Sequence, residues 1–499
     1  MFPNKDKIFS KGNWFNLILN IGIYVLIFLF ILLSLRYQYF LLEYMEWGDE
    51  SETIVTSKMM VAGMKLYSEI FNHHGPLTFL PGVLLESFGS FSVSDHRIYI
   101  AFFQILAILS IYKSPILISQ LSKICASVLS MTIILVFMPL IFGHMYKYQT
   151  LVGIFLVIIL AQYTLPAILD PKKLSSLWVV LGSFLIISLP FFAITYLPIA
   201  GLLFLSSFRF EYFKNIVIGS FLGLVTNLFF LGWYGSFPGY LAFHLYLNTQ
   251  VLPLYSEVQP GWNLIINAIQ SATSNKKHCI ALIILLPSLY LLTKKEDKFP
   301  WRTCLLFIGL FSLLMRGTGF HGMPYFYALL PLYALNFRLI NTDSLFFQKV
   351  SVFFLLICVL KISLIFPGEK EKITSNQVPT KTEFSKLVAE VTNPEDRIIV
   401  YSFRNIEYLV SERLPASGYF FYLPWQEKYN ENPKFGIHID ACKDIREAAP
   451  KVMYIDKWTV WDKFSWDSYA SCVQGVLNSN YYQVPGKPYY IRKDLLLSK

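Results

Sequence analysis

The sequence predicts an all-α polytopic membrane protein with a C-terminal α/β domain outside the membrane. Of its 499 residues, 55% are hydrophobic and only 15% are charged, against about 25% in soluble domains. Apolar runs close to membrane-spanning length recur between residues 14 and 366. Beyond residue 366 the chain becomes polar. A water-soluble protein is therefore excluded, and the bilayer is the main solvent.

Eleven apolar runs are predicted as membrane helices. Two short runs, 176–190 and 193–206, are separated around Pro190 and can form either two helices or one kinked element. The basic N-terminus precedes the first run without a small-residue cleavage site, so we interpret that run as an uncleaved span. The eleven runs are 14–35, 98–118, 124–142, 150–168, 176–190, 193–206, 215–234, 279–292, 303–315, 323–336 and 350–366.

Lysine and arginine in the loops between these runs predict the orientation. With the N-terminus inside, the inner segments contain 14 Lys and Arg in 56 residues, and the outer segments contain 8 in 120. An odd number of spans then places the first loop, 36–97, and the tail, 367–499, on the same outer side. The inner segments are 1–13, 119–123, 169–175, 207–214, 293–302 and 337–349.

The polar tail is predicted as a small α/β domain. Helical patterns at about 382–391 and 439–448 alternate with β-like runs at 397–403 and 451–456. It covers a site, binds an acceptor, or acts as a passive cap. Its two cysteines, Cys442 and Cys472, are either paired or both free.

The net charge of +10 does not indicate nucleic acid, because the basic residues are scattered in short loops and form no stripe.

Candidate chemistry lies in the first outer loop, where acidic residues cluster directly after a span. The run 51–66 has apolar residues at helical spacing, which predicts an amphipathic helix on the membrane surface, and a second apolar helix follows at about 76–88. An acid held there can act as a general base on a hydroxyl presented from water, or it can belong to a solvated face. The acidic residues are Glu43, Glu46, Asp49, Glu50 and Glu52.

Further residues of this loop follow in a characteristic order. They are Asp49-Glu50, Gly63, Leu66-Tyr67, Phe71, His73-His74-Gly75-Pro76-Leu77, Phe88-Gly89 and Arg97. This order resembles the first periplasmic loop of the GT-C glycosyltransferases. Within that group it resembles the bacterial lipopolysaccharide sugar transferases related to protein O-mannosyltransferases and the lipid A aminoarabinose transferase. The segment FHGMPYFYALLPLYAL at 320–335 resembles a span entry of the same family.

The resemblance implies a transmembrane catalytic domain at 1–366 and a periplasmic domain at 367–499, in a bacterial inner membrane. A sugar would move from a polyprenyl-phosphate donor to lipopolysaccharide, O-antigen or another surface glycan or lipid, with inversion. Asp49 would be the general base, with Glu50 beside it. Six residues predicted near the outer interface are candidates to contact the donor phosphate or the acceptor: His73, His74, Arg97, Arg316, His321 and Tyr325.

The chain departs from the family pattern at three points. Gly75 stands where the family has proline, and Gln149 stands where many relatives have a second carboxylate. The motif does not identify the cation that faces the lipid phosphate, and a divalent cation is possible without a clear metal motif. A protein acceptor is the alternative within the family. The alternative outside the family is a lipid-linked glycan flippase. A transporter of that kind is expected to show an internal repeat and ionisable residues at mid-span.

Overall fold

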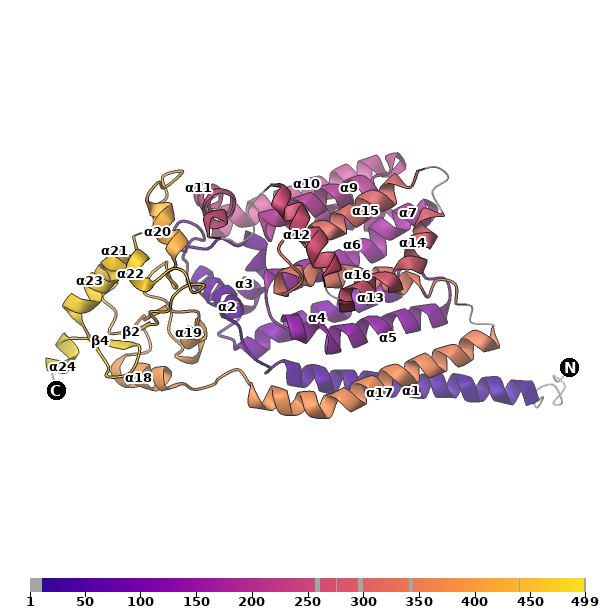
Figure 1. Cartoon of the computed structure of the whole chain (residues 1–499), viewed down its shortest axis with the longest axis horizontal. Coiled ribbons are helices and arrows are strands. Elements are labelled where there is room, and N and C mark those ends of the chain that lie inside the picture. Colours follow the sequence, from indigo (N-terminus) through magenta and orange to yellow (C-terminus); the bar gives the residue numbers. More distant parts are fainter. Residues whose placement is uncertain are drawn as a thin grey trace.

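The computed structural model describes residues 11–255, 261–274, 276–294, 299–340, 344–438 and 440–497. Its helices form an elongated bundle, and the C-terminal residues form a smaller unit beyond one end of that bundle (Figure 1). Helix α1 begins at the opposite end and runs alongside α17 (Figure 1). The predicted fold class is confirmed.

Each predicted span contains a helix. Within the described residues, five segments are long and apolar enough to cross a membrane: Ile18–Leu41, Val93–Tyr112, Tyr148–Leu169, Phe210–Tyr234 and Leu345–Ser375. The helices of the bundle are α1 (Lys11–Leu41), α4 (Val93–Tyr112), α5 (Gln120–Val136), α6 (Tyr148–Ile159), α7 (Leu165–Leu169), α8 (Ser176–Ser188), α9 (Leu197–Ser207), α10 (Phe213–Tyr234), α12 (Trp262–Thr273), α13 (Lys276–Ile284), α14 (Leu286–Thr293), α15 (Trp301–Ser312), α16 (Met323–Leu335) and α17 (Leu345–Ser375).

Helices α8 and α9 are two elements and not one kinked helix. Between them Ala193 is extended, with φ −160° and ψ 140°. After α9, Arg209 Nε donates to the carbonyl of Ala167 at 2.9 Å, and the Tyr212 hydroxyl donates to the carbonyl of Pro171 at 3.1 Å. Both acceptors lie just ahead of α8. The chain therefore returns through α9 to the end of the bundle where α8 begins.

The other connections predicted to lie inside gather at that same end. Arg302 donates to the carbonyl of Phe208 at 2.6 Å, and Arg338 donates to the carbonyl of Ile116 at 3.0 Å. The first outer loop lies at the other end, next to the C-terminal unit (Figure 1). The described loops thus lie at the two ends of the bundle.

The C-terminal unit is built on a four-stranded sheet with the order β1-β2-β4-β3. Strand β1 (Ile399–Tyr401) is parallel to β2 (Val452–Ile455), whereas β4 (Tyr489–Arg492) is antiparallel to both β2 and β3 (Tyr481–Gln483). The predicted α/β character of the tail is confirmed. Its helices are α18 (Glu383–Val391), α19 (Ile406–Val410), α20 (Pro424–Asn430), α21 (Ala441–Ala448), α22 (Trp466–Tyr469), α23 (Ser471–Asn480) and α24 (Asp494–Leu497).

The structure corrects one expectation about the tail, its first residue, and decides another, the state of its two cysteines. Helix α17 continues to Ser375, past the predicted boundary at residue 366, so the C-terminal unit begins later in the chain. Cys442 and Cys472 form a disulfide that joins α21 to α23, with their Cα atoms 6.2 Å apart. The paired alternative is therefore the one that the structure contains.

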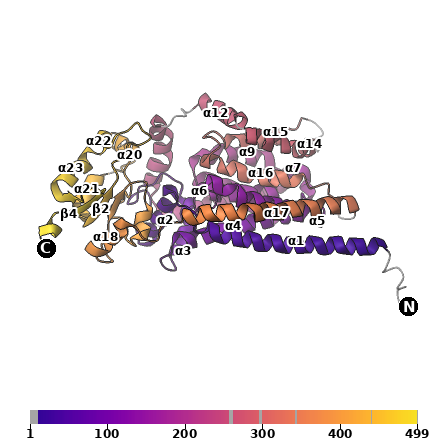
Figure 2. The same ribbon diagram turned by 60° about the horizontal axis from the view of Figure 1, so that its bottom comes forward.

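The first loop contains α2 (Gly48–Val61), η2 (Pro76–Thr78) and α3 (Leu80–Glu86), where the bundle meets the C-terminal unit (Figure 2). The expectation that the first helix lies on the membrane surface is wrong, because α2 is buried along most of its length. Val55 and Met59 share one apolar core with Tyr401 and Phe420 of the C-terminal unit. The C-terminal unit thus covers the helix that contains Asp49.

Candidate active site

Asp49 lies in the first turn of α2 and forms an ion pair with Lys147, which directly precedes α6. Asp49 Oδ2 is 3.3 Å from Lys147 Nζ, and the two side chains are 20% and 1% exposed. The ammonium also lies over the rings of Phe142 and Phe320, 5.5 and 4.6 Å from their centroids. A buried cation needs a counter-charge, so this pair holds the Asp49 carboxylate in place while leaving it accessible.

Glu50, the next residue, is fully buried and bound to Arg97 of α4. Arg97 Nε donates to Glu50 Oε1 at 2.8 Å, and the same guanidinium donates to the carbonyl of Tyr44 at 2.6 Å. Glu50 Oε1 also accepts from the backbone N–H of Tyr146 at 2.8 Å. The structure therefore does not place Arg97 as the predicted contact to a phosphate. Its donors hold the turn after α1 to α2, and Glu50 joins the second outer loop to them.

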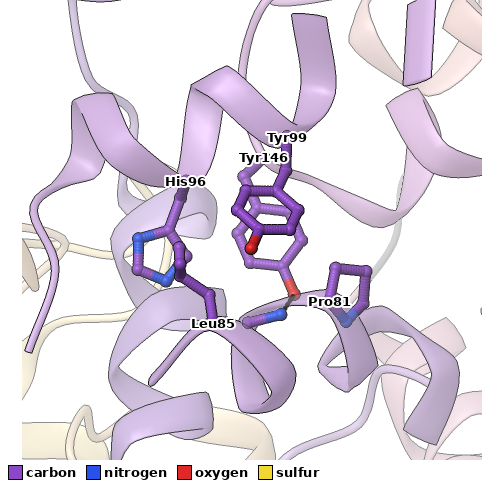
Figure 3. A pocket seen from close by; sticks show the side chains of 6 residues that line it. Pro81, Leu85, His96, Tyr99 and Tyr146 are labelled. Atoms are coloured by element: carbon purple, nitrogen blue, oxygen red, sulfur yellow. Dashed lines mark hydrogen bonds between the residues drawn. The ribbon is translucent and has the colours of Figure 1, made fainter. Parts of the chain in front are cut away.

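Figure 3 shows the packing around Tyr146, whose backbone N–H donates to Glu50. The Tyr146 hydroxyl accepts from the backbone N–H of Gly82 at 2.8 Å and donates to the carbonyl of Thr78 at 2.7 Å. The ring of His96 stacks on Tyr146 at 5.6 Å between centroids. The hollow that these side chains line has no room for a ligand. The residues that line this hollow therefore support the site and do not form part of it.

The segment with the two histidines is fixed to α2 by Asn72. Its side-chain amide donates to Glu52 Oε1 at 3.0 Å and to Thr56 Oγ1 at 3.2 Å, and its oxygen accepts from the backbone N–H of His74 at 2.9 Å. Glu52 lies three residues after Asp49 and therefore on the same face of α2. The histidines are thus held beside the Asp49 side of the helix.

Gly75, the departure from the family pattern, has a physical reason. Its N–H donates to the carbonyl of Phe192 at 2.8 Å, in the turn between α8 and α9. A Cβ at this position would lie 2.0 Å from the carbonyl oxygen of Phe191. Proline has neither the N–H nor the space, so this turn requires glycine.

His73, His74 and Glu52 form a buried polar cluster. Burial, and then the charge of Arg316, lower the pKa of His73 to about 4, and burial lowers that of His74 well below its usual value. Burial, and then Asp49, raise the pKa of Glu52. The Nδ1 atoms of both histidines are buried and have no hydrogen-bond partner in the described part of the chain.

One ligand atom from each of these three residues lies within 4.8 Å of the others. Neutral imidazoles and a carboxylate are suitable ligands for zinc and similar cations. The residues present therefore fit a divalent cation.

Arg316 and His321 approach the same cluster from the connection between α15 and α16. Arg316 is exposed, and its Nη2 is 3.3 Å from His321 Nε2. Burial, and then the charges of Arg316 and Lys147, lower the pKa of His321 to about 2. Arg316 also acts electrostatically on His73. The structure thus brings Asp49, His73, His74, Arg316 and His321 together at one end of the bundle.

Comparisons with known proteins identify the fold. No family model matches the sequence, and no curated protein matches it. Among solved structures, ArnT from Cupriavidus metallidurans in the apo state matches with a TM-score of 0.55. The alignment covers 93% of this chain and 97% of that chain at 10% identity. This chain therefore has the same fold as that ArnT.

An oligosaccharyltransferase from Archaeoglobus fulgidus, in a complex with Zn and sulfate, is similar at a TM-score of 0.49. It is 12% identical over 93% of this chain and 73% of that chain. The archaeal oligosaccharyltransferase AglB, in complex with an inhibitory peptide and a dolichol-phosphate, has a TM-score of 0.46. It is 12% identical over 94% of this chain and 74% of that chain.

Tyr325 is not part of the cluster that contains Asp49 and the two histidines. Its hydroxyl is 3.0 Å from His278 Nε2, and the other ring nitrogen of His278 is 2.7 Å from the carbonyl of Ala272. Tyr325 is buried between α16 and the start of α13. These contacts make it a packing residue at the helix interface, whereas the sequence predicted a substrate contact.

Sequence reasoning missed three residues of the site. Lys147 is the only Lys or Arg of the second outer loop, and a single cation in that loop could have indicated that it lies at the site. His244 and Asn248 lie on the π-helix η9 (Tyr240–Val251), a geometry often found at functional sites but not visible in the sequence. Asn248 Nδ2 donates to the carbonyl of His73 at 2.7 Å. Gln149 is buried, and its amide has no partner among the described residues.

Proposed function

We propose that this chain is a membrane glycosyltransferase that moves a sugar from a polyprenyl-phosphate donor to a surface glycan or lipid such as lipopolysaccharide or O-antigen. The observation that supports this most is the accessible Asp49 carboxylate, held by buried Lys147 and surrounded by Arg316 and neutral histidines. An acid of this kind beside several cationic and hydrogen-bonding groups matches the needs of a reaction that deprotonates a hydroxyl and releases a phosphate.

In the proposed reaction Asp49 accepts the proton of an acceptor hydroxyl. The hydroxyl oxygen attacks the anomeric carbon of the donor sugar from the face opposite the phosphate. The new carbon–oxygen bond forms as the bond between that carbon and the phosphate oxygen breaks. The electron pair leaves with polyprenyl phosphate, and the configuration at the anomeric carbon inverts.

The leaving phosphate gains charge during this step, and cations next to it lower the barrier. Arg316 is exposed at the site and contacts His321, so its guanidinium is available to the phosphate. Neutral His73 and His321 are suited to donate hydrogen bonds to phosphate oxygens. Lys147 holds Asp49 before transfer. A divalent cation bound by Glu52, His73 and His74 would add positive charge beside the phosphate.

The proposal places the protein in a bacterial inner membrane, with the N-terminus in the cytoplasm and the C-terminal unit in the periplasm. Membrane lipids surround the bundle, and the lipid tail of the donor lies among them. Alkaline phosphatase fused at residues 60, 250 and 450 should be active, and fluorescent protein fused at residues 172 and 296 should fluoresce. Opposite sides for the fusions at 60 and 450 would contradict the proposal.

The direct test is transfer by the purified chain in lipid nanodiscs. Radiolabelled sugars on polyprenyl phosphate are supplied with lipopolysaccharide, and label in the acceptor is measured. We expect at least one donor to be consumed and its sugar to appear in the acceptor with inverted configuration. If no donor is consumed while the chain carries lipid-linked glycan across proteoliposome membranes, the protein is a flippase and the proposal is wrong.

A further inference from the structure

A row of aromatic rings leads from the Asp49–Lys147 pair to the C-terminal unit. Successive ring centroids along it are 6.4, 5.7, 6.4 and 4.9 Å apart. Lys147 lies over the first two rings. We call this set the aromatic row, and in order its members are Phe320, Phe142, Trp47, Phe403 and Trp458.

The rings in the middle of the row are exposed. Trp47 is 41% exposed and Phe403 is 37% exposed, although both are large apolar side chains. The backbones that carry them are in close contact, because a Cβ on Gly48 would lie 2.5 Å from the carbonyl oxygen of Phe403. Exposed aromatic rings that neighbouring rings and backbone hold in place provide a preformed surface for a ligand.

The outer end of the row lies where ligands commonly bind on α/β sheets. Phe403 follows β1, and Trp458 follows β2, and these two strands are parallel. The carboxyl ends of parallel strands meet at one edge of a sheet, and loops at that edge commonly form binding sites. Here this edge faces the start of α2, where Trp47 precedes Asp49 by two residues.

The direction of the row indicates the chemistry of the ligand. It leads from the bundle towards the C-terminal unit, which lies beyond the ends of the spans (Figure 1). A lipid tail would remain among the spans. Charged residues lie close to the outer rings in the sequence: Arg404 follows Phe403, and Asp456 precedes Trp458 by two residues, whereas the ammonium of Lys457 lies over Tyr490. Flat aromatic faces beside hydrogen-bonding groups fit sugar rings, which present C–H groups on one face and hydroxyls at the edge.

We propose that the aromatic row binds the saccharide of the acceptor, with sugar rings stacked on the exposed faces and the reacting hydroxyl directed to Asp49. This inference rests on the proposed function and names its acceptor as a glycan. A protein acceptor would need no row of this kind.

The test measures binding separately from turnover. The full chain with Asp49→Asn is titrated in nanodiscs with lipid-free oligosaccharide released from the lipopolysaccharide of the host cell, and binding is measured by calorimetry. We expect binding, a loss of about tenfold in affinity for Trp458→Ala, and near-normal affinity for Trp458→Phe. The matched control is Trp461→Ala, because Trp461 is an exposed residue of the same loop that stacks on Trp425 instead.

Kinetics provide a second measurement on the active chain. Trp458→Ala should raise the KM for the acceptor about tenfold and leave kcat and the KM for the donor unchanged, which loss of folding would not do. Any of three results would overturn the inference. They are no binding of the oligosaccharide, an equal loss of affinity in Trp461→Ala, and an oligosaccharide signal that empty lipid vesicles alone account for. If the wild-type chain binds oligosaccharide but consumes no polyprenyl-linked sugar, the proposed function fails and saccharide binding by the row stands.

Discussion

Arg97→Ala removes the cation that neutralises Glu50 inside the protein. Both side chains are buried, and the guanidinium also donates to the carbonyls of Tyr44 and Leu42 at 2.6 and 3.1 Å. Removing one partner leaves a buried carboxylate without a counter-charge, which costs about 3–5 kcal/mol. Glu50 directly follows Asp49 in the first turn of α2. A shift of Glu50 would therefore also shift the Asp49 carboxylate, and this variant should lose most of its activity.

The assay for this variant is the free energy of unfolding in mixed micelles, followed by circular dichroism. The double variant Arg97→Met with Glu50→Met should recover part of the loss, because it removes the unpaired charge but leaves the carbonyl of Tyr44 and the N–H of Tyr146 without these partners. Arg404→Ala, an exposed arginine, should change stability by less than about 0.5 kcal/mol. An unchanged stability of Arg97→Ala together with a raised KM for the donor would refute this reasoning and restore Arg97 as a phosphate contact.

Three further changes test other parts of the structure. Gly75→Ala should cost about 1–3 kcal/mol in thermal unfolding experiments, whereas Gly201→Ala, whose Cβ meets nothing within 4 Å, should not. Burial raises the pKa of Glu46 to about 7. The folded chain therefore keeps a proton that the unfolded chain loses near pH 4.5, and stability falls as pH rises from there to about 7. Glu46→Gln should thus gain about 1–2 kcal/mol over the wild type at pH 8 and little at pH 5. Zn²⁺ should bind to the metal-free chain, as measured by calorimetry, and Glu52→Gln should weaken that binding at least about tenfold; equal affinity in the variant would dismiss this ligand set.

Much of the fold could be predicted because it depends on local composition. Apolar runs determine where spans lie, and basic loops separate the two ends of the bundle. The helix of the first loop was predicted at 51–66, whereas α2 begins at Gly48 and ends at Val61, so Asp49 lies in its first turn and not ahead of it. The alternation of helices and strands in the tail could likewise be read from its pattern.

The contacts of the site could not be predicted, because they depend on pairing between distant segments. Proximity to the membrane surface placed Arg97 near the site, but it did not show that its side chain points into the protein towards Glu50, 47 residues away. Lys147 was missed because its pairing with Asp49 joins segments 98 residues apart and leaves no local pattern. The burial of α2 was missed because its polar face contacts protein and not water.

The measurement that tests the central claim most directly is turnover of Asp49→Asn, purified and supplied with a polyprenyl-linked sugar that the wild type consumes. Asn keeps the shape of the side chain but cannot accept the proton, so turnover should fall about 100- to 10,000-fold while unfolding stays near wild type. Asp170→Asn is the matched control, because Asp170 pairs with Lys173 at the opposite end of the bundle, and it should leave turnover unchanged. Near wild-type turnover of Asp49→Asn would contradict the account.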